Sequence, residues 1–297
     1  MGRVVVVGSR ANRTSARLVE SWRDLGLDAE LVGGRDLATL VPGDVALGRL
    51  DVLPGCDGVE PGLFHLLVLE RRGGRVLNTA AGLLAAHDKL RTTKLLRAGG
   101  LPQPRSAWVR TAGDPVPLPA PLVVKPRFGS WGVDVHRCET DAEARRLLVR
   151  LRDRPWFRRH GALVQELVPP AGRDLRVLVA AGKVIGAAVR TAAPGEWRTN
   201  VSLGGRKKRA EAGPRSEALA LAAAAAVGCD LAAVDLLPTE DGPVVLEVNA
   251  AADFDDDYAP PGVICDEAVA RALGLLEGVR CSRQVAAAPP RTSAVVR

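Results

Sequence analysis

The stretches Leu231-Ala-Ala-Val-Asp235 and Pro243-Val-Val-Leu-Glu-Val-Asn249 decide the interpretation of this chain. Both are short apolar runs, and we predict that each is a β-strand, with Asp235 at the end of the first. Successive side chains on a strand point to opposite faces, so Glu247 and Asn249 share one face while Val248 points to the other. Three oxygen donors can therefore converge.

Oxygen donors of this kind are the ligands that a hard divalent cation prefers. We therefore predict a site for one or two Mg²⁺ (or Mn²⁺) ions, held by Asp235, Glu247 and Asn249. Magnesium held by few protein groups usually completes its shell with water and substrate phosphates, so a nucleotide is the expected ligand. The competing interpretation is a pair of strands at sheet edges whose polar ends are only solvated.

The size and composition of the chain indicate a globular protein of more than one unit. It has 297 residues, of which 47% are hydrophobic and 25% are charged, and single cores usually stop growing at about 250 to 300 residues. No apolar run approaches the roughly 20 residues that span a bilayer. The run Val4 to Val7 is too short for a signal peptide. We therefore expect a cytoplasmic protein that does not interact with membranes.

The charge pattern favours an anionic partner without identifying it. A net charge of +7 fits such a partner, although a bias toward arginine explains it equally well. Nucleic acid is not expected, because only 3% of the residues are aromatic and none alternate with the basic runs. The five cysteines include no Cys-x-x-Cys pair and are odd in number, which argues against a disulfide framework and a zinc site.

The order of apolar segments and breakers predicts a mixed fold, α/β at the amino terminus and α+β beyond it. Strands at Val4–Val7 and Ala29–Val32 flank a helix near 14–25, as in a parallel, Rossmann-like α/β unit. Gly8-Ser9-Arg10 lacks the spacing of a dinucleotide fingerprint. One helix is expected over 80–98, ended by glycines. The predicted boundaries are 1–85 for the amino-terminal domain, 86–165 for a central subdomain with a glycine loop, 166–281 for a carboxyl-terminal subdomain with the metal site, and 282–297 for a disordered tail.

A second constellation surrounds Lys125, which ends the predicted strand Leu122-Val-Val-Lys125. The glycine loop that follows, Pro126-Arg-Phe-Gly-Ser-Trp-Gly132, contains small residues that let backbone amides approach phosphates, while the lysine supplies a positive charge. Lys89 provides a second lysine upstream, and Glu166 ends a later strand, where it can accept from nucleotide hydroxyls. Each residue alone also fits an exposed surface position.

The order of these features along the chain is more specific than any one of them. It runs Asp88-Lys89, Val124-Lys125-Pro126, Gly129-Ser-Trp-Gly132, Gln165-Glu166, Arg173-Asp-Leu-Arg176, Glu196-Trp-Arg-Thr-Asn200, Asp235 and Glu247-Val-Asn249. Over about residues 80 to 275, this order resembles the ATP-grasp superfamily and looks most like its RimK-type branch of carboxylate-amine ligases. That branch contains glutamate ligases and the carrier-dependent ligase of lysine biosynthesis.

The resemblance implies an ATP-grasp fold in which ATP lies between two α+β subdomains. It implies phosphate contacts for Lys89 and Lys125 and a glycine loop that closes over the phosphates. Arg176, Arg190 and Arg198 are expected to be the catalytic cations, facing phosphate and substrate. The expected nucleotide contacts are Lys89, Lys125, Gly129, Ser130, Trp131, Gly132, Gln165, Glu166, Leu167, Asp174, Arg198 and Asn200, and the expected metal ligands are Asp235, Glu247 and Asn249.

The chemistry that this set favours is ATP-dependent, ADP-forming ligation of a carboxylate to an amine. Transfer of the γ-phosphoryl group turns a carboxylate into an acyl phosphate that an amine attacks, and the transfer needs mainly alignment and charge neutralisation. We expect an amino acid such as glutamate to be joined to a small molecule, a peptide or an acidic carrier protein, and the resemblance allows a homodimer or homotetramer. Two alternatives stay open: a ligase that forms side-chain esters or amides on a precursor peptide, and a nucleotide-binding module without turnover.

The resemblance does not explain two charged segments of the chain. Many relatives continue after the metal-binding asparagine with a Ser-Pro-Gly type turn, whereas this chain has Asp253 and Asp255–Asp257 in an acidic loop. The loop either favours a cationic amine substrate or is only solvated. Gly204-Gly-Arg-Lys-Lys-Arg209 is expected to be a basic loop that docks an acidic protein or is likewise solvated.

Lys125→Met is expected to lower turnover by several orders of magnitude, because the phosphates lose the charge that aligns them. Measurement of ADP release at steady state tests this, with circular dichroism as the check that the variant is folded. Turnover of the folded variant at the wild-type rate would contradict the role assigned to Lys125.

Overall fold

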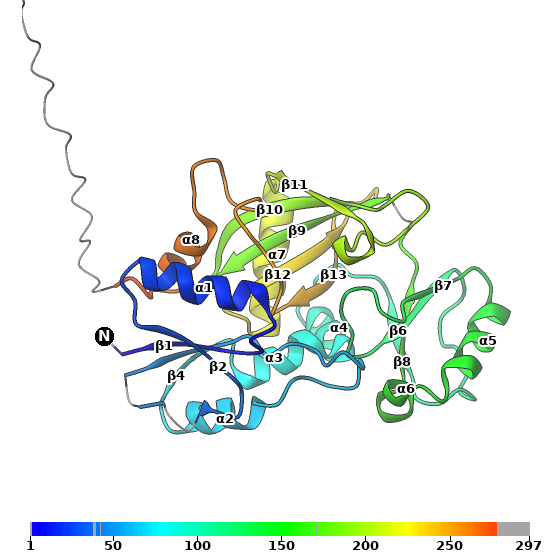
Figure 1. Cartoon of the computed structure of the whole chain (residues 1–297). Helices are drawn as coiled ribbons and strands as arrows, with labels where there is room; N and C mark the ends of the chain where they lie inside the picture. Colours follow the sequence, from blue (N-terminus) through cyan, green and yellow to red (C-terminus); the bar gives the residue numbers. More distant parts are fainter. Residues whose placement is uncertain (1, 38–39, 42, 170, 278–297) are drawn as a thin grey trace, which may run out of the picture.

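The structure, a computed structural model, describes residues 2–37, 40–41, 43–169 and 171–277. Its strands form three sheets, with helices between and around them (Figure 1). The predicted tail at 282–297 lies outside the described residues. No helix in the described part of the chain is long and apolar enough to cross a membrane.

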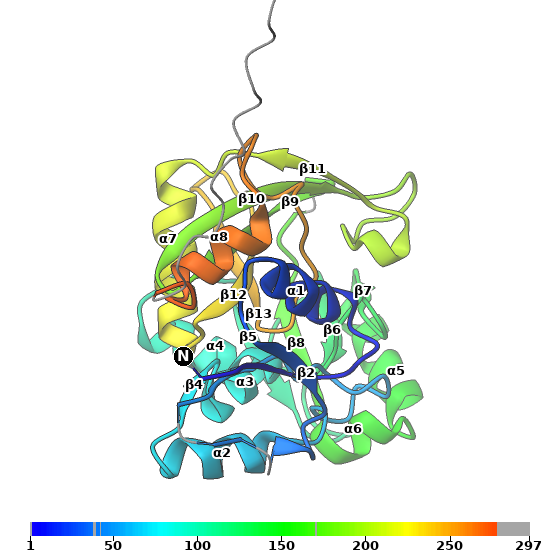
Figure 2. The same ribbon diagram turned by 60° about the vertical axis from the view of Figure 1, so that its left-hand side comes forward.

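The amino-terminal unit is a parallel sheet with the strand order β2-β1-β3-β4. Four consecutive valines form β1, and all of them are buried, as expected for a parallel sheet covered on both faces. Helix α1 covers the face toward the rest of the molecule, and α2 lies on the opposite side (Figures 1 and 2). The bounds are β1 Val4–Val7, α1 Arg13–Asp24, β2 Ala29–Val32, β3 Val45–Gly48, α2 Leu63–Arg71 and β4 Arg75–Leu77.

The helix expected over 80–98 is interrupted, which corrects the sequence interpretation. Helix α3, Ala80–His87, ends before Asp88, and α4, Lys89–Ala98, begins after it. Asp88 has an extended backbone, and its side chain accepts hydrogen bonds from two amides in the first turn of α4, so it caps that helix. Arg127 donates two further hydrogen bonds to the same carboxylate. Because Asp88 caps α4 and is paired with Arg127, the chain forms two helices here in place of one continuous helix.

The second sheet is antiparallel, with the order β5-β8-β6-β7, and α5 and α6 contribute to its core. Strand β6, which carries Lys125, is buried along its whole length. Helix α6 buries Trp156 and Phe157, while Arg158 and Arg159 stay exposed. The bounds are β5 Ser106–Val109, β6 Leu122–Pro126, β7 His136–Cys138, α5 Asp141–Leu151, α6 Pro155–His160 and β8 Ala162–Glu166.

The third and largest sheet is antiparallel, with the order β11-β10-β9-β12-β13. Alternate residues of β9 enter two cores: Val177 and Val179 share a core with α7, whereas Leu178 and Ala180 share one with α1 and α8. The large sheet is therefore covered on both faces, and α1 links it to the amino-terminal unit (Figure 1). The bounds are β9 Arg173–Ala180, β10 Lys183–Thr191, the 3-10 helix η2 Val201–Leu203, β11 Arg206–Ala210, α7 Pro214–Val227, β12 Leu231–Leu237, β13 Val244–Asn249 and α8 Cys265–Ala272.

Two further expectations about this sheet were wrong. Strand β12 does not end at Asp235 but runs to Leu237, so the aspartate lies inside a strand that has neighbours on both sides. The segment expected as a basic loop, 204–209, is largely β11, which pairs with β10. In both places pairing with a neighbouring strand extends the strand beyond what the local sequence pattern indicates.

Asn78 connects the amino-terminal sheet to the large sheet. It is completely buried and has φ +52°, a left-handed conformation that asparagine tolerates. Its side-chain nitrogen donates to the carbonyl oxygens of Gly48, Leu231 and Ala250. Its side-chain oxygen accepts from the amides of Asp230 and Leu231. One side chain therefore satisfies backbone groups of three separate segments.

Asn78→Ala is expected to lower the free energy of unfolding by about 3 kcal/mol, because several buried backbone groups lose their partner. Urea denaturation followed by circular dichroism measures this loss. Gln103→Ala is the control, because it removes one hydrogen bond, from Nε2 to the carbonyl oxygen of Thr93. The control should lose about 1 kcal/mol, and equal losses in the two variants would contradict the connecting role of Asn78.

Candidate active site

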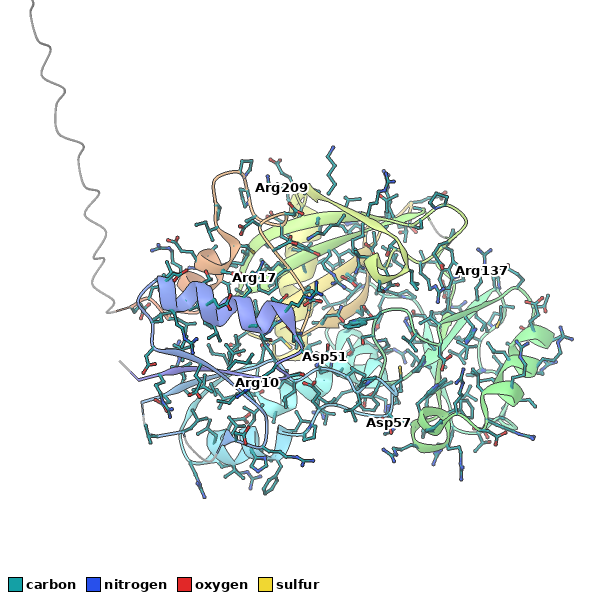
Figure 3. The ribbon with its side chains drawn as sticks, viewed as in Figure 1. Arg10, Arg17, Asp51, Asp57, Arg137 and Arg209 are labelled. Atoms are coloured by element: carbon teal, nitrogen blue, oxygen red, sulfur yellow. The ribbon has the colours of Figure 1, made fainter. Side chains whose placement is uncertain are left out.

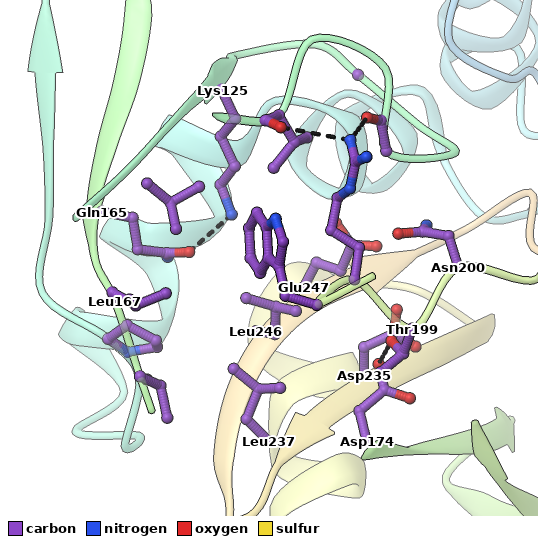
Figure 4. A pocket seen from close by; sticks show the side chains of 18 of the residues that line it. Lys125, Gln165, Leu167, Asp174, Thr199, Asn200, Asp235, Leu237, Leu246 and Glu247 are labelled. Atoms are coloured by element: carbon purple, nitrogen blue, oxygen red, sulfur yellow. Dashed lines mark hydrogen bonds between the residues drawn. The ribbon is translucent and has the colours of Figure 1, made fainter. Parts of the chain in front are cut away.

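A cavity between the second sheet and the large sheet contains the residues that the sequence predicted as nucleotide contacts (Figure 4). Its space of about 980 Å³ includes a part that is open to solvent. Both sheets and the glycine loop contribute to its walls. The predicted nucleotide contacts that line it are Lys89, Lys125, Gly129, Ser130, Trp131, Gly132, Gln165, Glu166, Leu167, Asp174, Arg198 and Asn200.

The three predicted metal ligands lie next to one another, and two of them, Asp235 and Glu247, line this cavity. Asp235 on β12 and Glu247 on β13 are direct neighbours across the two strands. Asn249 follows on the same face and donates through Nδ2 to Oε1 of Glu247 at 3.1 Å. Arg176 on β9 faces Asp235 from the other side. The alternation of the strands therefore placed the donors correctly, while their role in holding a metal stays a prediction.

Asp235 is held by two arginines. It is 1% exposed, and Arg176 donates through Nε to Oδ1 at 2.6 Å and through Nη2 to Oδ2 at 2.8 Å. Arg190 donates to Oδ2 at 2.8 Å and also forms a two-point pair with Asp174. Thr199 adds a hydrogen bond to Asp174 at 2.6 Å (Figure 4). Buried charges are stable only when they are paired, so these side chains act as one unit.

This unit changes the expected position of two arginines. Arg176 and Arg190 were expected to face phosphate and substrate, with ion pairs to surface acids as the alternative. Their partners are acids, but Asp174 and Asp235 are buried. Arg190 lines the cavity beside them, whereas Arg176 is not among the lining residues. Direct contact of either arginine with a substrate is therefore untested.

The pKa values of the two acids of the predicted metal site are shifted in opposite directions. Burial raises the pKa of Asp235, although Arg176 and Arg190 oppose this effect. Burial also disfavours the charged form of Glu247, but Lys89, Lys125 and Arg176 outweigh it and hold its pKa well below the usual range. Glu247 is therefore a carboxylate at neutral pH, as a ligand of a hard cation must be.

The donor set fits a divalent cation that is shared with phosphates. Two carboxylates and one amide are too few for a complete protein cage, and magnesium sites of this kind take further oxygens from water and phosphate. The described residues contain no cluster of three or more His, Cys, Asp or Glu suited to a metal. A cation in this cavity would accordingly rest on Asp235, Glu247 and Asn249.

Two lysines approach the cavity from different elements. Lys89 donates through Nζ to the carbonyl oxygen of Gly129 at 2.6 Å and lies 3.3 Å from Oε2 of Glu247, so it bridges the glycine loop and β13. Lys125 is 5% exposed, and its Nζ donates to Oε1 of Gln165 at 2.7 Å (Figure 4). Burial and the nearby charge of Lys89 lower the pKa of Lys125 to about 8.

The segment 196–200 holds the glycine loop from the opposite side. Arg198 donates through Nη1 to the carbonyl oxygen of Gly132 at 2.9 Å and pairs with Glu196 at 2.8 Å. Gly132 has φ +76°, and a Cβ at this position would lie 3.1 Å from Oδ1 of Asn200. Only glycine combines that conformation with so close an approach. The predicted Arg-x-Asn segment thus contacts the loop, and contact with phosphate is untested.

The apolar wall of the cavity was missed in the sequence analysis. Leu237 lies two residues after Asp235 on the same strand, so simple alternation places it on the same face. Leu246 breaks the alternation, because the pairing register shifts between Asp235 and Leu236. The shift leaves one extra residue on β13, and both Leu246 and Glu247 line the cavity (Figure 4). No local signal in the sequence marks this bulge.

Glu166 has a more exposed position than its neighbour Gln165. Its carboxylate pairs with Arg105 at 2.5 Å, and 40% of its side chain is exposed. Gln165 is buried and connects Lys125 to the hydroxyl of Ser106. A nucleotide hydroxyl that binds the carboxylate of Glu166 would thus share that carboxylate with Arg105.

The acidic and basic segments contact each other, so neither is the free loop that was expected. Lys207 on β11 forms an ion pair with Asp255 and lies 3.6 Å from Asp257. Arg209 donates to the carbonyl oxygen of Asp256 at 2.7 Å. Lys207 already balances part of the negative charge of these aspartates. Their attraction of a cationic amine stays a prediction.

The fold and the cavity define an ATP-grasp protein, and comparison with known sequences specifies the family. The family described as RimK-like ATP-grasp domain matches residues 86–266. A probable alpha-L-glutamate ligase of Pseudomonas aeruginosa is 33% identical over 257 residues, which cover 80% of this chain and 83% of that protein. One from Aeromonas salmonicida is 36% identical over 181 residues, or 59% of each chain. The chain belongs to the RimK-like ATP-grasp family.

Solved structures agree in architecture. D-alanine–D-alanine ligase from Bacillus anthracis, complexed with ATP, has a TM-score of 0.69 at 18% identity, covering 92% of this chain and 96% of that one. The ATP-grasp ligase PsnB, complexed with a minimal precursor, has a TM-score of 0.64 at 21% identity, covering 93% of this chain and 99% of that one. At these identities the likeness concerns the fold, and it confirms the predicted ATP-grasp fold.

Lys125 is expected to make the use of ATP depend on pH. Its pKa of about 8 lies below the usual lysine value, so the ammonium form is present below pH 8 and is lost above it. Because phosphate binding needs that charge, kcat/KM for ATP should fall by up to about tenfold per unit above this pH. Lys125→Arg keeps its charge throughout and should give a flat profile, at a lower plateau. A level wild-type profile up to about pH 9.5 would contradict this assignment.

Proposed function

We propose that this protein is an ATP-dependent, ADP-forming ligase that joins a carboxylate to an amine through an acyl-phosphate intermediate, with an amino acid such as glutamate among its substrates. The observation that carries the proposal is the arrangement of opposite charges in one cavity. Glu247 lies 3.3 Å from Nζ of Lys89, and Asp235 is its direct cross-strand neighbour. Such a site can bind both the phosphates of ATP and the cation that accompanies them.

The residues of the cavity supply what phosphoryl transfer requires. The reaction depends on alignment and on neutralisation of negative charge, with little covalent help from the protein. Lys89 and Lys125 would hold the phosphates, and Asp235, Glu247 and Asn249 would hold Mg²⁺, which supplies Lewis-acid stabilisation of the charge on the phosphates when bound. Arg198, anchored on the glycine loop, would neutralise charge on the transferred group.

The choice of an amino-acid substrate rests on the relatives. The sequences matched over most of their length are named as probable alpha-L-glutamate ligases. The match to the Pseudomonas aeruginosa protein covers 80% of this chain, which is more than the part at 86–266 that matches the family alone. Glutamate is therefore the first amino acid to test, with a carboxylate on a small molecule, a peptide or a carrier protein as its acceptor.

Release of ADP and phosphate from ATP and magnesium should rise when the correct amino acid and acceptor are both present. An amino-acid panel combined with candidate acceptors measures this, and mass spectrometry of the acceptor identifies the product. A gain equal to one amino acid minus water supports ligation. Loss of water from a peptide acceptor, with no added amino acid, would replace the proposal by side-chain cross-linking of a precursor.

Glu247→Gln is expected to lower the rate of ADP formation at least about a hundredfold, because it removes one of two carboxylates from the predicted cation site. The variant keeps the size of the side chain and is compared with Glu166→Gln, which changes an exposed carboxylate at the edge of the cavity. The second substitution should cost less than tenfold. Similar rates in both variants would contradict the metal role of Glu247.

A further inference from the structure

A groove separate from the ATP cavity lies at the outer edge of the second sheet. All three residues of β7 line it, together with six residues of α5 between Glu143 and Arg150. Arg137 on β7 is labelled at the right of Figure 3, on the same side of the molecule as α5 in Figure 1. The groove therefore runs between a strand and the helix that follows it in the chain.

The strand wall of this groove can accept another extended chain. Strand β7 pairs with β6 on one side, and no strand of the described residues lies on its other side. An outer strand leaves backbone N–H and C=O groups without a strand partner, and a further strand can pair with them. Peptides are often recognised in this way, while their side chains contact a neighbouring surface. In this groove that surface is α5.

The groove carries an excess of positive charge. Four arginines line it against one carboxylate, that of Glu143, which already accepts a hydrogen bond from the amide of Glu139. Three of the four arginine side chains are exposed and have no ion pair or hydrogen bond among the described residues: Arg145, Arg146 and Arg150. Positive charge that is gathered in a groove attracts anionic partners.

Arginines that follow α5 in the chain differ from those in the groove. Arg152 pairs with Asp153 at 3.3 Å, and Arg154 pairs with Asp134 at 3.4 Å. The lack of acidic partners is therefore a property of the groove, and it does not extend to every basic side chain of this subdomain.

The spacing of two groove arginines matches an extended acidic chain. Arg146 and Arg150 are four residues apart on α5, so they share a face and are separated by about 6 Å along the helix. Residues two apart in an extended chain also share a face, with a separation of about 6.6 Å. Two acidic side chains with one residue between them would thus reach both arginines. The lined part of α5 is about 10 Å long, which is room for three or four extended residues.

A peptide suits this groove better than a nucleic acid, the other common anionic polymer. None of the residues that line the groove is Phe, Tyr or Trp, so bases would find no stacking surface there. Val149 is 49% exposed and offers an apolar contact to a peptide side chain. The backbone of β7 complements a peptide backbone and has no such match with a sugar-phosphate chain.

The groove adjoins the cavity that contains the predicted ATP contacts. Val135 lines that cavity, and the next residue, His136, lines the groove. The carbonyl oxygen of Val135 accepts from Nη1 of Arg198 at 3.3 Å, and the same nitrogen donates to the glycine loop at Gly132. A chain bound along β7 would therefore have one end beside the ATP cavity.

We propose that an extended acidic segment of the acceptor docks in this groove as an added strand on β7, with two carboxylates at alternate positions paired with Arg146 and Arg150. A guanidinium can donate two hydrogen bonds to one carboxylate, which makes arginine well suited to this pairing. The inference rests on the proposed function and specifies its acceptor as a peptide or protein with acidic residues at alternate positions.

Fluorescence anisotropy with short labelled peptides, in the absence of ATP, measures docking. Two peptides of threonine and valine are compared, one with the pattern Glu-Thr-Glu and one with Glu-Glu-Thr, so that composition and charge are equal. The first should bind wild-type protein about fivefold more tightly, because only it directs both carboxylates toward α5. Equal affinities, or no binding of either peptide, would overturn the inference.

Arg146→Gln combined with Arg150→Gln should weaken binding of the Glu-Thr-Glu peptide about tenfold and remove the difference between the two peptides. The control combines Arg71→Gln with Arg72→Gln, which changes the net charge equally at exposed positions of the amino-terminal unit. The control should keep the affinity within about twofold of wild type. Equal losses in the two double variants would show a general effect of charge and contradict the groove.

Modified probes test the role of β7 and the class of partner. N-methylation of single peptide amides should weaken binding at every second position, because alternate amides of an added strand donate to β7. If no methylated position binds more weakly, the strand is not used and the inference falls. An oligothymidylate that binds more tightly than the peptide, through the same two arginines, would replace the acidic peptide by a nucleic acid.

Kinetics distinguish failure of this inference from failure of the proposed function. With an acceptor that carries the acidic pattern, Arg146→Gln with Arg150→Gln should raise the acceptor KM about tenfold and leave kcat and the KM for ATP within about twofold. If wild-type protein binds the Glu-Thr-Glu peptide but forms no ligation product, the groove stands and the reaction falls. If ligation proceeds with an unchanged acceptor KM in the double variant, the groove falls and the reaction stands.

Discussion

The site depends on one buried electrostatic unit, the carboxylate of Asp235 held between Arg176 and Arg190. These groups lie at the centre of the large sheet, out of water, where each charge is tolerated only because the others are present. Asp174 and Thr199 extend the unit to the wall of the cavity. The same contacts that make the sheet stable therefore also set the position of the acid that would hold the metal.

Strand β13 joins this unit to the parts of the chain around it. Lys89, at the start of α4, connects Glu247 on this strand to the glycine loop. The segment that follows Asn249 is held by side chains of the amino-terminal unit, Arg49 among them. Phosphoryl transfer requires several groups to be aligned at the same time. A strand with partners on three sides is a suitable support for that alignment.

The parts of the site that could be predicted follow from local rules. Residues two apart on a strand share a face, which was enough to bring Glu247 and Asn249 together. The order of the motifs was enough to suggest the family, which the match over 86–266 confirms. The errors have non-local causes. The helix is interrupted at Asp88, where Arg127, 39 residues later, donates hydrogen bonds to the capping carboxylate. Leu246 enters the cavity because of a register shift against β12.

The sequence alone determined which chemical groups are available, which of them alternate on a strand and in what order they follow one another. Only the tertiary structure decided which charges are paired and which are left free. Asp235 meets Arg176 across 59 positions, and Arg49 meets the carbonyl oxygen of Ala252 across 203. Strand register and packing between distant segments bring such groups together, and no local pattern encodes them. For this reason the buried acids that pair with Arg176 and Arg190 became visible only in the folded chain.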